Sequence, residues 1–201
     1  MAEDPNESRA REFLIGRGFR VERFGKAETR VGKTPDFHVY QGDAFRFYCE
    51  VKGVDPDRWL DRLLDNAPPG QIVGGGRQDP VFNRLTGDIH QAVKQFDAVN
   101  PDLHHANVLI FVNNPGSNCG YGDLLSALTG QFFADSGERF PIYTVYSEGR
   151  IKHEKLRVHL YIWLEPDGKA YKFFPGLIRQ HERDLCLWFG KDPSDIPRLD
   201  A

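Results

Sequence analysis

Two carboxylates and a lysine near the first quarter of the chain could support metal-dependent hydrolysis. Asp36 follows Pro35, and Glu50 and Lys52 flank Val51 in the next apolar segment. Mg²⁺ prefers oxygen ligands and is bound by one or two carboxylates together with waters and substrate phosphates. A lysine beside such a cation can orient an attacking water or stabilise charge on a phosphate. These residue types favour phosphodiester chemistry, provided that folding brings Asp36 and Glu50 together.

A β-hairpin would bring them together. Residues 35–52 alternate between apolar and polar side chains about a turn at Gly42-Asp43, as a hairpin should. Pairing symmetric about residue 43 predicts the pairs Asp36 with Glu50, His38 with Tyr48, and Tyr40 with Arg46. One face is then expected to hold Phe37, Val39, Phe45, Phe47, Cys49 and Val51. The other face is expected to hold Asp36, His38, Tyr40, Arg46, Tyr48, Glu50 and Lys52.

Opposed carboxylates on neighbouring strands repel each other and normally destabilise a sheet. A divalent cation between Asp36 and Glu50 would turn that repulsion into coordination. The Val51 carbonyl lies between the two polar side chains of Glu50 and Lys52 and could supply a further ligand. The register therefore predicts a site for Mg²⁺ or Mn²⁺.

The surrounding periodicities predict an alternation of helices and strands. The elements expected up to residue 113 are a helix over 4–18, a strand over 19–24, the hairpin, a short helix over 57–64, a helix over 87–99 and a strand over 107–113. Residues 67–76, rich in Pro and Gly, read as a flexible loop. Beyond residue 113 we expect a helix over 123–132 and strands over 142–146, 158–164 and 170–174. The pattern is that of an α/β protein.

Pro35-Asp36 and Glu50-Val51-Lys52, on a hairpin that follows a helix and within an αβββαβ order, resemble the PD-(D/E)XK, or restriction-endonuclease-like, nuclease superfamily. The resemblance covers roughly residues 4–113. It implies a mixed central sheet flanked by helices, with a helical and Gly-rich insertion at about 55–82. Residues 114–201 would form a C-terminal α+β extension of one domain that spans residues 1–201.

In that family Asp36 and Glu50 would be metal ligands, and Lys52 would position or activate the attacking water. Several branches also place a glutamate on the first helix near the metal, a role for which Glu7 and Glu12 compete. On a helical wheel Glu7 falls beside the inward stripe that includes Leu14, whereas Glu12 points away, so we select Glu7. The alternative for Glu7 is the glutamate of a capping box opened by Asp4.

Many members of the family use a polar residue of the following helix to support the lysine or touch phosphate. Gln95 flanks the apolar stripe of the helix over 87–99 most closely, so it joins the predicted catalytic set. The alternative is a solvated helix residue. The predicted metal ligands are thus Asp36, Glu50, the Val51 carbonyl and Glu7, and the predicted catalytic residues are Asp36, Glu50, Lys52 and Gln95.

A second local signal is a basic stretch that could contact a nucleic-acid backbone. It contains Lys152, Lys155 and Arg157 and precedes an aromatic strand with Tyr161 and Trp163. Acidic residues are interspersed, so a solvated edge is the alternative interpretation.

Composition narrows the function class only in part. The net charge of −3 provides no global attraction to nucleic acid, although a basic face or bound cations could supply it locally. Three widely spaced cysteines and the absence of a long apolar window favour a cytoplasmic protein without a membrane span or a structural metal. The expected function is a metal-dependent nuclease acting on nucleic acid, with DNA as the expected substrate, and a homodimer is compatible with the sequence. The alternative is a catalytically silent module that binds nucleic acid or a protein.

Overall fold

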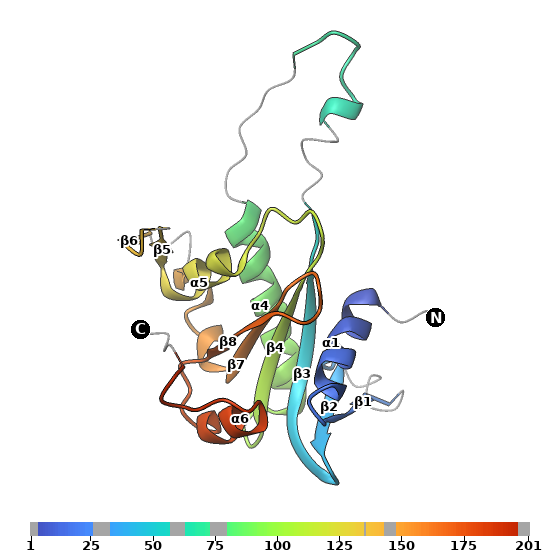
Figure 1. Cartoon of the computed structure of the whole chain (residues 1–201), viewed down its shortest axis with the longest axis vertical. Coiled ribbons are helices and arrows are strands. Elements are labelled where there is room, and N and C mark those ends of the chain that lie inside the picture. Colours follow the sequence, from blue (N-terminus) through green and yellow to red (C-terminus); the bar gives the residue numbers. More distant parts are fainter. Residues whose placement is uncertain are drawn as a thin grey trace.

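A six-stranded mixed sheet forms the centre of the computed structural model, which describes residues 4–25, 33–56, 63–72, 80–134, 136–142 and 148–196 (Figure 1). The strands are β1 (Arg20–Arg23), β2 (Phe37–Gln41), β3 (Ala44–Val54), β4 (Ala106–Asn113), β7 (Leu160–Leu164) and β8 (Tyr171–Pro175), in the spatial order β1-β2-β3-β4-β7-β8. β3, β4 and β7 run parallel, and the other neighbours are antiparallel. A separate two-stranded sheet pairs β5 (Gln131–Phe133) with β6 (Arg139–Pro141).

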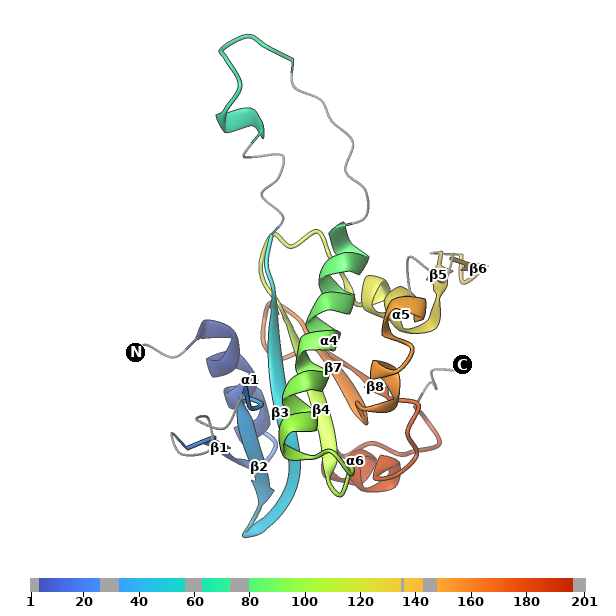
Figure 2. The same cartoon turned by 180° about the vertical axis from the view of Figure 1, so that it is seen from behind.

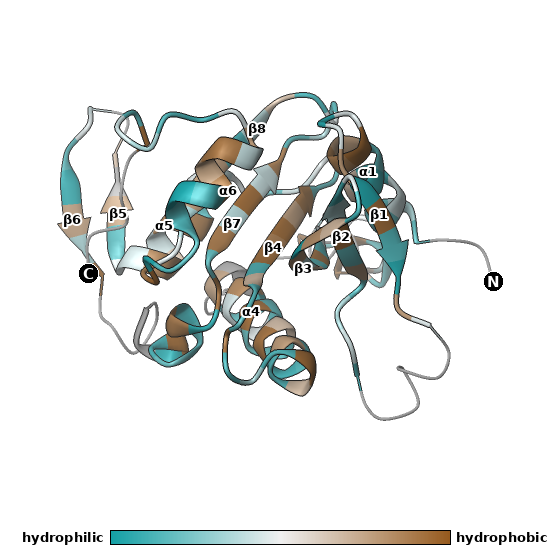
Figure 3. Ribbon diagram, turned by 90° about the horizontal axis from the view of Figure 1, so that it is seen from below, coloured by the Kyte–Doolittle hydropathy of each residue, from teal (hydrophilic) through white to brown (hydrophobic). Residues whose placement is uncertain are grey.

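Helices pack on both faces of the large sheet. One face is covered by α1 (Pro5–Ile15) and α6 (Glu182–Trp188), and the other by α4 (Pro80–Val99) and α5 (Tyr121–Thr129). Figure 3 shows α1 and α4 on opposite sides of the apolar strands. Two 3₁₀ turns, Glu148–Ile151 and Glu154–Leu156, precede β7. The prediction of an α/β fold with helices flanking a mixed sheet is therefore confirmed.

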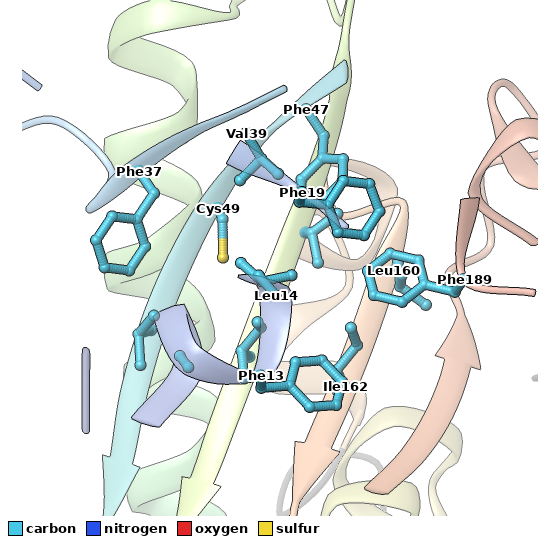
Figure 4. Packing of buried hydrophobic residues seen from close by; sticks show 14 of the residues in the cluster. Phe13, Leu14, Phe19, Phe37, Val39, Phe47, Cys49, Leu160, Ile162 and Phe189 are labelled. Atoms are coloured by element: carbon cyan, nitrogen blue, oxygen red, sulfur yellow. The ribbon is translucent and has the colours of Figure 1, made fainter. Parts of the chain in front are cut away.

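The core is deepest at the parallel strands because helices cover them from both sides. All residues of β7 are buried, as are all residues of β4 except Asn113. This explains their nearly continuous apolar sequence, which is typical of parallel strands. On the α1 side, Figure 4 shows Phe13 and Leu14 packing toward Cys49 of β3 and Ile162 of β7.

The first helix forms where the sequence predicts it. Asp4 caps it by accepting a hydrogen bond from the Asn6 N–H at 2.7 Å, and Pro5 occupies its first turn. The predicted inward stripe is buried, namely Ala10, Phe13 and Leu14. Glu12 is exposed, as expected.

Polar contacts hold α1 at the carboxyl ends of the parallel strands. The Arg9 guanidinium donates to Asn114 Oδ1 at 2.8 Å and to the backbone carbonyls of Asn113, Glu165 and Pro166. The Asn114 amide donates to Asn6 Oδ1 at 3.0 Å. A side chain at Gly53 would collide with Asn6, so glycine allows this close approach of α1 to β3. These contacts bind the helix to three strands at once.

The hairpin forms with one departure from the predicted register. His38 pairs with Tyr48 as predicted, but a bulge after Val39 pairs Tyr40 with Phe45, so the prediction that Tyr40 faces Arg46 is wrong. The bulge inserts Arg46 as the extra residue and reverses the two side chains. Phe45 joins the rings of His38, Tyr40 and Tyr48, and Arg46 lies on the opposite face.

Both reversed residues find aromatic partners. The Arg46 guanidinium lies 5.1 Å from the ring centroid of Trp188 on α6. Phe45 packs edge-on against His105, with ring centroids 4.7 Å apart. The predicted segregation of the two faces therefore fails at Phe45 and Arg46, which exchange faces, whereas Tyr40 stays on the face of His38 as predicted.

Other boundaries also shift. α4 begins earlier than the predicted helix, although its buried stripe is the predicted one, with Ile89, Ala92, Val93 and Phe96. α5 ends at Gly130 in a left-handed conformation, so Phe132, predicted to be helical, lies in β5. α6 was not predicted.

Two predicted elements fall mainly outside the described residues. Of the helix expected over 57–64, the described residues 63 and 64 belong to a helical turn. The strand expected over 142–146 has only its first residue described. The three cysteines, Cys49, Cys119 and Cys186, are buried free thiols, in line with the prediction. Within the described residues, no helix combines the length and apolar character needed to cross a bilayer.

Replacing Arg9 with alanine should destabilise the protein, because four oxygen acceptors in and after the carboxyl ends of β4 and β7 lose a charged donor. We expect the free energy of unfolding to fall by about 2 kcal/mol, measured by urea denaturation. Glu12→Ala on the exposed side of α1 is the matched control and should change stability by less than about 0.5 kcal/mol. Equal stability of the two variants would contradict the docking role of Arg9.

Candidate active site

The backbone hydrogen bonds between β2 and β3 stop at the beginning of β2, and the side chain of Asp36 takes the place of the next backbone acceptor. The Asp36 Oδ2 atom accepts a hydrogen bond from the Val51 N–H at 2.8 Å, in place of a backbone carbonyl of a paired strand. Continuing the register from Phe37 with Cys49 would place Pro35 opposite Val51. Proline has no N–H to offer the Val51 carbonyl.

The Val51 carbonyl points to the same side of β3 as Asp36. In a β-strand, the N–H and C=O of one residue lie along the same edge, and the Val51 N–H is directed at Asp36. Asp36 and the Val51 carbonyl therefore converge at the end of β2. This geometry fits the predicted use of that carbonyl as an oxygen ligand.

Glu50 presents a second carboxyl group from β3, opposite Asp36 in the continued register. It is 2% exposed, and its Oε2 atom is buried without a hydrogen-bond donor. Burial, reinforced by the negative charge of Asp36, raises the pKa of Glu50 to about 8 in spite of the neighbouring Lys52. Burial also raises the pKa of Asp36. Burial thus favours the protonated form of the Glu50 carboxyl group when no metal is bound.

Lys52 connects the buried glutamate to α4. Its Nζ donates to Glu50 Oε1 at 2.7 Å and to Gln95 Oε1 at 3.4 Å. The Gln95 amide in turn donates to the Thr34 carbonyl at 2.9 Å, on the segment that leads into Asp36. Gln95 therefore bridges the lysine and the aspartate segment, which excludes the alternative that it is only a solvated helix residue.

Glu7 faces the site from α1 but is held by an arginine. Its Oε2 atom pairs with the Arg23 guanidinium at the end of β1. Burial raises the pKa of Glu7, and the charge of Asp36 raises it further, so the two carboxylates are electrostatically coupled. Arg23 also lowers the pKa of Asp36. The side-chain acceptor of the α1 N-terminus is Asp4, so the capping alternative for Glu7 does not describe its principal contact.

Sequence reasoning missed one acidic residue near the lysine. Burial raises the pKa of Asp88 on α4 to about 6, while Lys52 and Arg84 oppose the shift and Asp55 reinforces it. Asp88 stands two helical turns before Gln95, so the two side chains share a face of α4. That spacing was visible in the sequence.

A pocket of about 380 Å³ opens beside Asp36 and is lined by Arg23, Phe24, Lys33, Thr34, Pro35, Asp36 and Gln95. Two cations, Arg23 and Lys33, therefore border the candidate site on the side open to solvent. Neither was predicted. Arg23 reaches the pocket through the pairing of β1 with β2, which is a tertiary feature, whereas Lys33 lies only three residues before Asp36 in the sequence.

The donor set fits a hard divalent cation. Among the described residues, no three Asp, Glu, His or Cys side chains cluster as a metal site. Mg²⁺, however, commonly takes one or two carboxylates and completes its octahedron with waters and substrate oxygens. Asp36, Glu50 with its donor-free buried oxygen, and the Val51 carbonyl provide such a set. Glu7, held by Arg23, lies outside it in this arrangement.

The predicted basic stretch does not form one exposed patch. Lys155 is buried, and its Nζ donates to the Leu128 carbonyl at 3.0 Å. The Arg157 guanidinium binds the Asp97 carboxylate and donates to the Pro101 carbonyl at 2.6 Å. Lys152 remains exposed. The correction has a physical reason, because α5 and the end of α4 supply oxygen acceptors that a local sequence window cannot show.

Comparisons of the chain with family models, curated proteins and solved structures found no match. The interpretation of this site therefore depends on its own geometry.

The raised pKa of Glu50 predicts a pH-dependent stability of the metal-free protein. Between about pH 4.5 and 8 the unfolded chain releases this proton and the folded chain retains it, so stability should fall as pH rises through that range. Glu50→Gln retains the shape without the titration. Its advantage over the natural chain should grow by roughly 1 kcal/mol per pH unit, measured by urea denaturation in EDTA.

Glu12→Gln, an exposed substitution of the same type, is the control and should parallel the natural chain at every pH. A Glu50→Gln variant that also parallels the natural chain would show that Glu50 is ionised in the folded, metal-free state.

Proposed function

We propose that the chain is a metal-dependent nuclease that hydrolyses phosphodiester bonds of nucleic acid, with DNA as the first substrate to test. The observation that carries the proposal is a pair of opposed carboxyl groups beside Lys52. Asp36 is half-buried, and Glu50 is buried. Such a pair is unfavourable as two neighbouring negative charges. A divalent cation bound by both carboxylates would neutralise their charges and supply the Lewis acid for hydrolysis.

In this proposal Asp36, Glu50 and the Val51 carbonyl hold Mg²⁺ or Mn²⁺. The bound cation would polarise the scissile phosphate and lower the pKa of a water ligand. Glu7 contributes negative charge from α1 through its coupling to Asp36, while Arg23 offsets part of it.

Lys52 is positioned to orient the attacking water and to stabilise negative charge that develops on the phosphate. Its Nζ is directed by Glu50 on one side and by Gln95 on the other. Gln95 acts as a positioning residue, since it touches Lys52 and the Thr34 backbone. The cationic pocket wall, Arg23 and Lys33, is suited to approach by a phosphate backbone.

Two substitutions should separate metal binding from turnover. Glu50→Ala removes a ligand and should abolish both Mn²⁺ binding, measured by calorimetry, and metal-dependent cleavage. Lys52→Ala should keep Mn²⁺ affinity within about threefold or improve it, because a competing cation is gone, yet reduce cleavage at least about a hundredfold. Lys169→Ala, an exposed lysine in the turn between β7 and β8, is the control and should change neither property.

The cleavage assay uses plasmid, linear duplex, single-stranded and branched DNA and RNA, each with Mg²⁺, Mn²⁺ or EDTA. Cleavage in the metal arms alone supports the nuclease proposal. Equal Mn²⁺ affinity of the natural chain and Glu50→Ala would refute the metal site. Metal binding without cleavage of any substrate would favour the catalytically silent module.

A further inference from the structure

An aromatic surface adjoins the candidate active site on the hairpin. Five half-buried rings make up this aromatic platform: Phe24, His38, Tyr40, Phe45 and Tyr48. Phe24 stacks on His38 with ring centroids 3.8 Å apart, and Phe45 contacts Tyr48 at 4.8 Å. His105 contacts Phe45 and extends the surface toward β4.

The bulge in β3 is what assembles the platform. In the regular register Phe45 would point into the α1 face, and the rings of Tyr40 and Tyr48 would lack it as a neighbour. The extra residue Arg46 turns Phe45 to the α4 side, where it contacts His38, Tyr40 and Tyr48. In the regular register Phe45 could have packed in the core on the α1 side. The bulge places its ring in the aromatic cluster on the other face instead.

This part of the sheet is not covered by a described helix. Figure 2 shows α4 crossing β3 and β4. In this view β2 lies beside α4, and no labelled helix lies in front of β2. The platform rings on β2 are therefore partly accessible, in contrast to the fully buried side chains of β7. Each of the five rings keeps part of its surface exposed, and exposed ring surface of this kind can stack with a planar ligand.

The platform is continuous with the candidate active site. Phe24 belongs to the platform and also lines the pocket that contains Asp36. His38 follows Asp36 by two residues on the same strand face, a separation of about 7 Å along the strand. A ligand that lies on the rings would thus lead directly into the pocket.

Cationic side chains lie beside the platform, and two of them are ion-paired, Arg20 with Glu22 and Arg23 with Glu7. Arg23 and Lys33 line the pocket, and the Arg20 guanidinium lies 4.2 Å from the centroid of the Tyr40 ring. Glu22 opposes His38 on β1 and is paired with Arg20. Rings flanked by cations are the combination with which proteins bind single strands, since bases stack on the rings and cations contact phosphates.

From this arrangement we propose that the substrate is single-stranded nucleic acid whose bases stack on the aromatic platform and whose backbone then enters the Asp36 pocket. The inference rests on the proposed nuclease function for its catalytic consequence. Duplex substrate is disfavoured because its bases stack on one another and do not present their faces to the protein.

Binding can be measured without cleavage. Fluorescence anisotropy in EDTA would use labelled single-stranded DNA, single-stranded RNA and duplex DNA, each of about 12 nucleotides per strand. The full chain should bind single strands at least roughly tenfold more tightly than the duplex. The DNA and RNA arms identify which sugar is preferred, and stronger binding to either supports the proposal.

Variants test the rings themselves. Tyr40→Leu and Phe45→Leu keep apolar volume but lose the aromatic face, so each should weaken single-strand binding by roughly fivefold or more. Tyr40→Phe and Phe45→Tyr keep the face and should retain affinity. Phe132→Leu changes an exposed ring on β5 and is the matched control, expected to bind like the natural chain.

Thermal unfolding checks that each variant is folded. Should the leucine variants not fold, photo-crosslinking of single-stranded DNA to the natural chain must map to the hairpin strands, residues 37–48. Duplex bound as tightly as single strands, affinity unchanged in the leucine variants, or crosslinks elsewhere would each overturn the inference. The two proposals can fail separately. Binding of single strands that depends on the rings, without metal-dependent cleavage, would contradict the nuclease proposal alone.

Discussion

The interruption of the β2–β3 ladder at Pro35 is the constraint on which the site depends. Proline cannot donate to Val51, and Asp36 places its carboxylate where a strand carbonyl would otherwise accept the Val51 N–H. This hydrogen bond fixes Asp36 opposite Glu50 at the end of the strand. The hydrogen bond thereby offsets the repulsion that would otherwise separate the two carboxyl groups.

The arrangement is electrostatically costly in the absence of a cation. Glu50 is buried with one oxygen lacking a donor, and its raised pKa records the cost of ionising it there. Lys52 reduces that cost without removing it. A purely structural hairpin would gain stability from an apolar residue at position 50, so this unfavourable charge placement supports the proposed function.

Helices from both faces of the sheet hold the ends of this arrangement. α1 is bound at the strand ends by Arg9 and Asn6, and it presents Glu7 to Arg23. α4 reaches the site from the other face through Gln95, which ties Lys52 to the segment before Asp36. The site is thus built at the boundary where a fully covered parallel sheet gives way to an open antiparallel hairpin.

The sequence by itself determined the elements that have strong local periodicity, together with the central residues of the site. Alternation about Gly42-Asp43 predicted the pairing of His38 with Tyr48, and so the approach of Asp36 to Glu50. The family resemblance implied a polar partner for Lys52 on the following helix, and the position of Gln95 beside the apolar stripe selected it; the two side chains are in contact. These predictions succeeded because the periods of strands and helices are properties of the local backbone.

The tertiary structure alone decided the rest. The bulge at Arg46 decides which face of the sheet Phe45 and Arg46 occupy. In these positions Arg46 contacts Trp188 of α6 and Phe45 contacts His105, which follows α4. The burial of Lys155 and the arrival of Arg23 at the pocket likewise depend on partners distant in the chain. Such contacts are set by burial and pairing energies summed over the assembled fold, and no local window of sequence contains them.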